Sequence, residues 1–449
     1  MAAAERERDL ATLAEALRLR AVLHHHRNEP ERARALADRS RATAIEAGSC
    51  RLEAEALNVL GGLDIECGAL DAARVVLLRA LDRARTDYAL WARIEQNLGI
   101  VANVRGDRQL ARWHYLRSLG AYRRVQDRRG CAVALHNLGM LSADRARWRK
   151  ADRQFERTRE LAREAGDVHL EALALLNGAE VKLAVGQPDL AERRAEEALR
   201  LFEQLGSAMD LADAWKALGL VSRRLGRPGA AEARLRTAVE LAAATGNLLT
   251  QAEAMLALAD VHLDAGRRRD AVAALSAAWR LFAALGAKPE LTRALERLHA
   301  LEEEYVASLE DALAFVAPGA RGRAARMAAY AAHLAQALGL DAVDLVAARI
   351  AAYLTVAERG GQDCPWQVED VAGRVRSRPA GDLAFGPHEP VLVHLLGLAS
   401  LYDELTEPNG IAPPLPPRSA IERIGAIGAA LSPLVMEAFA RTAPQFVAA

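Results

Sequence analysis

Three asparagines recur at an interval of 40 residues, at Asn97, Asn137 and Asn177, and Gln96 and His136 directly precede two of them. An asparagine side chain carries one acceptor and two donors, so it can pair with both the N–H and the C=O groups of a peptide backbone. A row of such side chains could therefore hold an extended chain without recognising its sequence. The simpler alternative is that the asparagines cap, fill or solvate a helical wall and recur because the segment was duplicated.

The other residues that could do chemistry do not form a known catalytic or metal-binding pattern. His24, His25 and His26 are consecutive, and consecutive helical residues point in different directions, so we expect solvated histidines rather than a metal site. The four cysteines include no CxxC pair, which predicts neither a zinc site nor a disulfide framework and is typical of a reducing cytosol. No nucleotide-binding or hydrolase motif occurs in a suitable context, and no helix-turn-helix is apparent. The sequence therefore predicts no catalytic residue, no metal and no cofactor.

The composition excludes several classes of protein. The 449 residues include 59 basic and 59 acidic side chains, so no net charge favours nucleic acid or an anionic membrane. Hydrophobic residues make up 51% of the chain and aromatic residues only 4%, which favours packed helices over sheets or disorder. No run of about 18 apolar residues is present, and the first residues form no apolar signal segment. We expect a cytoplasmic protein without nucleic-acid or membrane partners.

The first two thirds of the chain is one unit of about 40 residues copied seven times. The unit is anchored on a small residue, found at Ala21, Gly61, Gly99, Gly139, Ala179, Gly219 and Ala259. Alanine stands twelve residues after every anchor, and five of the copies have glycine seven residues after it. The two exceptions at that second position are Asn28 and Ala146.

Each of these marks has a physical explanation. A small anchor allows a neighbouring helix to cross closely, and a glycine seven residues later can adopt the left-handed conformation that ends a helix. The alanine at the twelfth position opens a second helix that packs on the first. Since Ala146 lacks this freedom, we expect a less sharply defined turn there. The unit is a helical hairpin that must stack on its neighbours to bury its apolar face.

This pattern resembles the tetratricopeptide repeat (TPR), whose Leu-Gly pair, turn glycine and alanines recur here in order. The clearest pairs are Leu60-Gly61, Leu98-Gly99, Leu138-Gly139 and Leu218-Gly219. The copies are longer than the usual repeat of about 34 residues and resemble the long type of bacterial signalling regulators and peptide-pheromone receptors. The resemblance implies an all-α fold, with a right-handed TPR superhelix of about seven hairpins over residues 1–288.

In TPR proteins the first helix of each hairpin lines a concave groove, and the resemblance indicates which positions face it. The polar residues at such positions are Gln96, Asn97, Asn103, Asn137, Asn177, Lys216 and Arg223. The asparagines would pair with the backbone of an extended peptide, as similar ladders do in peptide-binding TPR proteins. Lys216 and Arg223 would then take an acidic side chain or a terminal carboxylate.

The last third of the chain is expected to be a different helical domain. The 40-residue phase stops after Gly286, and residues 291–316 have the periodicity of one long amphipathic helix. We expect a capping or linker helix over residues 289–317 and a separate domain over 318–449. Within it, helices are expected at 323–360, 391–405 and 419–442, with loops at 360–390 and 407–417.

Residues 303–445 resemble an HD-GYP domain, a bacterial phosphodiesterase domain that acts on cyclic di-GMP. The matching segments are Arg321-Gly322, Arg326, Leu338-Gly339-Leu340, Ala351-Ala352 and residues 399–406. The family's catalytic positions do not match. Arg323 stands at the motif histidine, Thr355-Val356 at the metal-binding His-Asp pair and Ser400 at the metal-binding aspartate of the later motif. A metal-dependent hydrolase needs carboxylates and imidazoles there, so the resemblance implies a degenerate, non-catalytic domain. An unrelated helical domain is the alternative.

The sequence thus predicts a non-catalytic signalling scaffold that binds a peptide or partner protein in the concave groove. The C-terminal domain would contact another signalling protein or a second copy of the chain. The alternative functions are sensing of cyclic di-GMP, through arginines such as Arg321 or Arg323, and residual phosphodiesterase activity.

Overall fold

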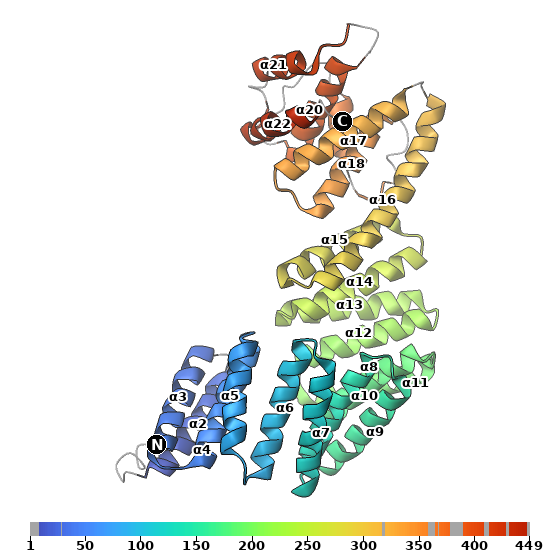
Figure 1. The fold of residues 1–449 in the computed structure, drawn as a ribbon. Helices are drawn as coiled ribbons and strands as arrows, with labels where there is room; N and C mark the ends of the chain where they lie inside the picture. The colour runs from blue at the N-terminus through green and yellow to red at the C-terminus, as the bar shows by residue number, and fades with distance from the viewer. Residues whose placement is uncertain are drawn as a thin grey trace. The chain divides into compact units, whose positions relative to one another are not determined.

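The computed structural model describes residues 9–27, 29–316, 319–357, 364–366, 368–377, 389–407, 413–427 and 431–446. All regular structure in these ranges is helical, which confirms the predicted all-α class for them. The chain divides into two compact units, residues 1–226 and 227–449, each drawn in Figure 1. The domain boundaries expected at residues 288 and 317 stay predictions.

The first unit consists of helix hairpins stacked one on the next (Figure 1). Its helices are α2 (Leu10–His26), α3 (Pro30–Glu46), α4 (Cys50–Glu66), α5 (Leu70–Arg83), α6 (Tyr88–Val104), α7 (Arg108–Arg124), α8 (Arg128–Ala143), α9 (Trp148–Glu164), α10 (Val168–Ala184), α11 (Pro188–Leu205) and α12 (Ala208–Arg224). Even-numbered helices are the first helices of the predicted copies, and odd-numbered helices are the second ones. Each second helix also packs on the first helix of the following hairpin.

The small anchors lie where the two helices of a hairpin cross. A methyl group added at three of them would lie far inside the contact distance of a large side chain from the second helix. The distances are 2.5 Å from Gly61 to Leu77, 2.4 Å from Gly99 to Tyr115 and 2.6 Å from Gly139 to Phe155. Each of these partners stands sixteen residues after its anchor, and the same position after Ala21 and Ala179 is held by alanine. The predicted close crossing is confirmed at these three anchors. Glycine faces a large side chain at each of them, alanine faces alanine at Ala21 and Ala179, and Ala259 departs from this pairing because Leu275 stands sixteen residues after it.

The turn at Ala146 differs from the sequence prediction. Ala146 has a φ of 52°, in the same left-handed region as Gly106 at 82°. Its N–H donates to the carbonyl of Ala143 at 2.8 Å, and the N–H of Arg147 donates to Ser142 at 2.9 Å, which repeats the bonds around Gly106. The expectation of a less defined turn is therefore wrong, because hairpin packing imposes the conformation on a residue that does not favour it. Asn28, the other exception, lies outside the described residues.

The second unit begins with helices of the same repeat and continues into the C-terminal helices. Its helices are α13 (Pro228–Thr245), α14 (Leu248–Asp264), α15 (Arg268–Leu285), α16 (Lys288–Val316), α17 (Ala320–Ala337), α18 (Ala342–Val356), α19 (Glu369–Arg376), α20 (Val391–Thr406), α21 (Pro417–Ile427) and α22 (Pro433–Phe446). The long helix expected over 291–316 is confirmed as α16. One core joins Leu275 of α15 and Leu298 of α16 to Leu334, Leu354 and Phe439 of the later helices.

Two local expectations for this unit are wrong. α19 lies inside the segment expected to be a loop, although residues 378–388 of that segment lie outside the described part. The helix expected over 419–442 is divided into α21 and α22, and α22 begins at Pro433, which cannot continue a preceding helix. No helix in the described ranges is long and apolar enough to cross a membrane.

Replacing Ala146 by glycine should stabilise the protein, because glycine adopts a φ of 52° without the strain that a Cβ imposes. We expect a gain of roughly 0.5–1 kcal/mol in the free energy of unfolding, measured by urea denaturation. The matched control is Gly106→Ala, where a Cβ would meet nothing within 4 Å but the backbone has a φ of 82°. Gly106→Ala should lower the free energy of unfolding by a similar amount. Unchanged urea midpoints for both variants would contradict the strain argument.

Candidate functional site

The predicted asparagine row lies on the first helices of the first unit. Asn97 is on α6, Asn137 on α8 and Asn177 on α10, each two residues before its anchor, and all three side chains are half-buried. Because the anchors lie at helix crossings, residues just before them are held at equivalent places in successive hairpins. The structure therefore places the three asparagines in equivalent positions on consecutive first helices.

Two of the three asparagines are already hydrogen-bonded to the preceding repeat. The Nδ2 group of Asn97 donates to Oδ1 of Asn58 at 2.9 Å, and that of Asn177 lies 3.3 Å from Nε2 of His136. Asn58 and His136 each stand three residues before an anchor, so both bonds join the same pair of positions in neighbouring hairpins. The sequence analysis missed Asn58, because it stands one residue out of phase with the other asparagines.

Asn137 and Gln96 occupy the equivalent pair of positions between these two bonds. Asn137 makes no side-chain hydrogen bond within the described residues, and Gln96 only accepts from the hydroxyl of Tyr122, at 3.4 Å. An amide side chain can form several hydrogen bonds, so most of the capacity of this pair is unused. The middle of the row is thus the place where a ligand backbone would meet unsatisfied amides.

His136 is held neutral beside Asn177. Burial, followed by repulsion from His169, lowers the pKa of His136 to about 4. Its ring packs edge-on against Phe155, with 5.7 Å between the ring centroids. With Nε2 accepting from Asn177, the proton of the neutral ring is assigned to Nδ1, a buried atom without a partner in the described part of the chain. His136 therefore acts as a neutral acceptor in the row.

The remaining predicted site residues do not join the asparagine row. Asn103 is half-buried in the last turn of α6 and makes no side-chain hydrogen bond among the residues described. Lys216 and Arg223 lie two turns apart on α12, hence on the same face of that helix. The ammonium group of Lys216 is 3.2 Å from a carboxylate oxygen of Asp213, so an acidic ligand would compete with this neighbour.

A buried ion-pair cluster behind the row was not predicted. Glu95 is fully buried, with 0% of its surface exposed, and contacts Nδ1 of His114 at 2.6 Å and the guanidinium of Arg117 at 3.1 Å. Arg117 lies over the rings of Trp91 and Trp113, at 4.6 and 4.2 Å from their centroids. The sequence feature that could have predicted this cluster is a glutamate, Glu95, within the apolar stripe of α6. These contacts join α6 to α7 and support the helix that carries Gln96 and Asn97.

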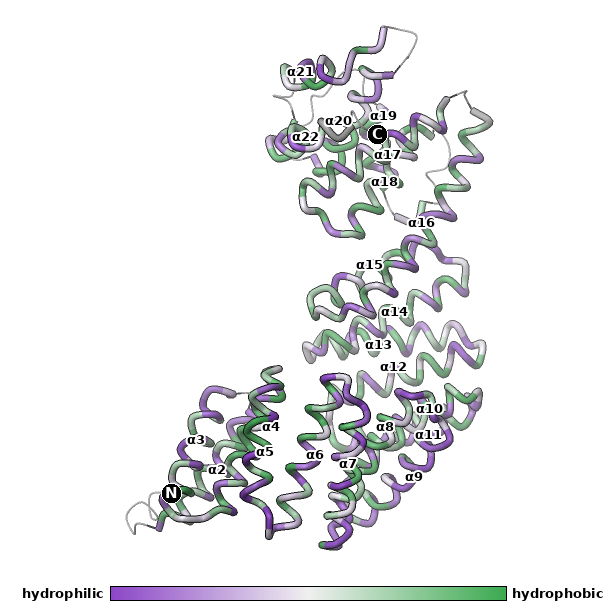
Figure 2. Tube along the Cα trace, in the orientation of Figure 1, coloured by the Kyte–Doolittle hydropathy of each residue, from purple (hydrophilic) through white to green (hydrophobic). Residues whose placement is uncertain are grey.

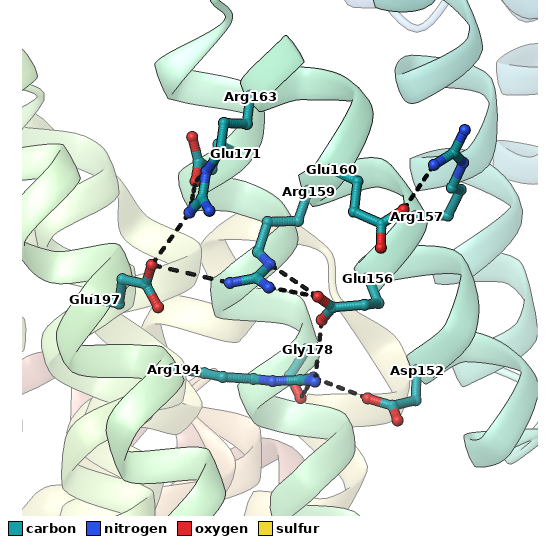
Figure 3. A network of polar contacts seen from close by, with 10 residues as sticks. All are labelled: Asp152, Glu156, Arg157, Arg159, Glu160, Arg163, Glu171, Gly178, Arg194 and Glu197. Carbon is teal, nitrogen blue, oxygen red and sulfur yellow. Dashed lines mark hydrogen bonds and ion pairs between the residues drawn. The ribbon is translucent and has the colours of Figure 1, made fainter.

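A second charge network joins α9, α10 and α11 (Figure 3). The guanidinium of Arg194 reaches Asp152 at 2.8 Å, Glu156 at 3.3 Å and the carbonyl of Gly178 at 3.3 Å. Arg163 donates to Glu171 at 2.8 Å through Nε. Asp152 and Glu156, which face α10 and α11 from α9, are therefore already paired within this network.

The arginines expected to contact cyclic di-GMP are engaged in ion pairs in the second unit. Arg321 donates to Glu310 at 3.0 Å and Arg323 to Glu404 at 2.9 Å, while Arg326 lies 2.8 Å from buried Asp403. Burial raises the pKa of Asp403, against the opposing effect of Arg326. No group of three or more histidine, cysteine or acidic residues that could hold a metal occurs among the residues described.

Acidification should destabilise the protein through His136. Its folded pKa of about 4 lies below the ordinary histidine pKa of 6.5, so its contribution to stability is complete above pH 6.5 and is lost as the pH falls towards 4. Between pH 7 and pH 4 we expect His136→Gln, which keeps an acceptor for Asn177, to lose about 3 kcal/mol less than the wild type in urea unfolding. The exposed His26→Gln is the control, and equal pH profiles for His136→Gln and the wild type would refute this assignment.

Comparison with known proteins identifies the repeat. The tetratricopeptide repeat family model matches residues 131–204. No curated protein matches the chain. Among solved structures, aspartyl phosphate phosphatase F from Bacillus subtilis has 11% identity and a TM-score of 0.50, covering 59% of this chain and 69% of its own. A signal transduction ATPase (STAND) protein with a tetratricopeptide repeat sensor from Pyrococcus horikoshii has 17% identity and a TM-score of 0.50. The match covers 63% of this chain and 43% of that protein.

A Rap protein complexed with competence and sporulation factor is also similar, at 16% identity and a TM-score of 0.49, covering 68% of this chain and 90% of its own. At these identities the similarity concerns the fold alone. None of these matches supports the HD-GYP-like resemblance of the C-terminal third, which stays a prediction. The chain contains tetratricopeptide repeats at residues 131–204, and the residues that the structure describes are all-α, with helix hairpins stacked on one another within the first unit.

Proposed function

We propose that this protein is a non-catalytic cytoplasmic scaffold that binds an extended peptide, or an extended segment of a partner protein, along its first helices. The observation that carries the proposal is the pair Gln96 and Asn137. Their amides are half-buried between two hydrogen-bonded pairs of the same geometry and have unused hydrogen-bonding capacity. A peptide backbone supplies alternating donors and acceptors that would satisfy both side chains.

The flanking pairs would extend this row. The Asn58–Asn97 pair is joined by one hydrogen bond, donated by Asn97, which leaves further donors and acceptors on both side chains. Asn177 and His136 would contact the ligand less, because a hydrogen bond already joins their side chains. Lys216 and Arg223 would attract an acidic side chain or the carboxylate end of the ligand, with Lys216 exchanging its contact to Asp213.

The C-terminal helices would act as an interaction or regulatory module within the same scaffold. A non-catalytic role is favoured by the residues at the catalytic positions of the HD-GYP family, namely Arg323, Thr355 and Ser400. An anion-sensing role is disfavoured because Arg321 and Arg323 already contact Glu310 and Glu404. A dinucleotide would have to displace these carboxylates.

The peptide-binding proposal is tested best with Asn137→Ala. Peptides selected on the intact chain from a displayed random library would be synthesised and titrated by fluorescence polarisation. We expect Asn137→Ala to weaken binding about tenfold, equivalent to the loss of roughly 1.4 kcal/mol of hydrogen bonding. Its thermal stability should not change, because Asn137 has no side-chain partner in the described structure.

The matched control is Gln109→Ala, which removes an exposed amide from the second helix α7. Asn97→Ala is less suitable as a sole test, because it also breaks the bond to Asn58 and should lower stability by about 1 kcal/mol. Equal affinity of the wild type and Asn137→Ala for every selected peptide would eliminate the row as the binding site.

Calorimetric titration with cyclic di-GMP separates the alternative function from the scaffold. We expect no heat of binding, because the candidate arginines are paired with carboxylates. A saturable signal that is lost in Arg323→Gln but kept in the exposed Arg193→Gln would instead favour a nucleotide sensor.

A further inference from the structure

Positive charge is concentrated in one part of this neutral chain. Residues 105–157 contain fourteen lysines and arginines against five acidic residues, a net charge of +9, whereas the whole chain has 59 of each kind. α7 alone carries five arginines and no acidic residue. The compensating acidic charge lies elsewhere in the chain, so this stretch has an electrostatic potential that the net charge of zero conceals.

Several carboxylates of this stretch are engaged in hydrogen bonds or ion pairs of their own, although Asp107 also lines the pocket described below. Asp107 and Asp127 cap helices, accepting from the N–H groups of Leu110 at 2.9 Å and Gly130 at 2.8 Å. Asp152 accepts from Lys182 and Arg194 in the network of Figure 3, both at 2.8 Å. The hydropathy trace of α9 is mostly hydrophilic, in keeping with charge on both of its sides (Figure 2).

A group of cations remains between α7 and α9 without such partners. Burial, and then repulsion by three neighbouring arginines, lowers the pKa of Lys150. These neighbours are Arg112 of α7, Arg147 at the N-cap of α9 and Arg153 of α9. None of the four has an ion pair or a side-chain hydrogen bond in the part of the chain that the structure describes. Like charges held together without carboxylates repel one another, so an external anion would stabilise them.

An apolar pocket adjoins α7 and is formed with α5 and α6. It has a volume of about 540 Å³, and its apolar walls are Leu78, Leu98, Val101, Leu110 and Trp113. Two of these side chains are unusually exposed for their type, Trp113 at 49% and Leu78 at 45%. A recessed apolar surface of this kind is typical of a binding site rather than of a solvated helix face.

Charged side chains also contribute to the lining of the pocket, namely Arg74, Arg105 and Asp107. Arg105 is paired with Asp71, whereas Arg74 has no partner within the described ranges. Arg112 of the cation group and Trp113 of the pocket are consecutive residues of α7, so the two features lie on neighbouring faces of this helix, about 100° apart. The cations lie on α7 and at α9, which are second helices, whereas the pocket also includes Leu98 and Val101 of the first helix α6. No asparagine of the row lines the pocket.

We propose that this surface, named here the α7 surface and made of Arg112, Lys150, Arg153 and the pocket around Leu78 and Trp113, docks an acidic segment of a partner protein. The carboxylates of the segment would lie between α7 and α9, and one bulky apolar side chain would enter the pocket. Charge complementarity selects an acidic partner, and the aliphatic side chains Leu78, Leu98, Val101 and Leu110 in the pocket favour an aliphatic side chain of a polypeptide.

The test uses the intact chain and labelled synthetic peptides in fluorescence polarisation. The probe is an amphipathic peptide of glutamate and leucine, compared with a glutamate–serine peptide of equal charge and with a single-stranded oligonucleotide. We expect the glutamate–leucine peptide to bind most tightly and its affinity to fall with added salt. Arg112→Gln/Arg153→Gln should weaken it about fivefold, and Leu78→Asn by a similar factor.

Matched variants on α11 control for charge and apolar area. Arg193→Gln/Arg200→Gln removes two exposed cations, and Leu190→Asn removes one exposed leucine, from another second helix. Both should bind the probe like the wild type. The four variants concern exposed side chains, so their thermal transitions should match that of the wild type. Equal binding of the α7 and α11 variants, or tighter binding of the oligonucleotide through Arg112 and Arg153, would overturn the proposal.

Discussion

The close crossing of the two helices in each hairpin is the constraint on which the rest of the structure depends. At Gly99 the backbone of α6 approaches Tyr115 so closely that a methyl group would lie 2.4 Å from its ring, and Gly139 meets Phe155 in the same way. This contact fixes the position of the first helix along the second one. Residues two and three positions before the anchor are consequently held in the same place in every copy. The bond from Asn97 to Asn58 and that from Asn177 to His136 are equivalent for this reason.

The repeat and its helices could be predicted because they follow from local chemistry. A small anchor, a turn glycine and an alanine on the second helix each have one physical meaning, and the structure agrees with all three. Ala146 shows the limit of this reasoning, since stacking imposes a left-handed backbone on alanine. The break between α21 and α22 was missed even though Pro433 stands at the start of α22, because helical periodicity was given more weight than the proline.

The candidate site could be predicted less completely than the fold. The equal spacing of Asn97, Asn137 and Asn177 located the row, but it could not show which of them are already bonded. That depends on the register between neighbouring hairpins, which brings a residue three positions before one anchor to a residue two positions before the next. Asn58 stands out of phase in the sequence and is nevertheless in contact with Asn97. Only tertiary structure distinguishes the unsatisfied Asn137 from its paired neighbours.

The two helices of a hairpin carry different chemistry, and this gives the protein two surfaces with different responses to salt. The first helices present neutral amides, and even His136 is kept neutral by a pKa of about 4. Hydrogen bonds between neutral groups depend little on ionic strength. The cations of α7 and α9 instead act through a field that is screened over about 8 Å at physiological salt. Glu95 and the carboxylates of the network in Figure 3 are already paired with other side chains. The positive charges of Arg112, Lys150 and Arg153 therefore have no carboxylate partner among the described residues. Internal ion pairing thus stabilises the hairpins and, at the same time, leaves α7 with its positive surface.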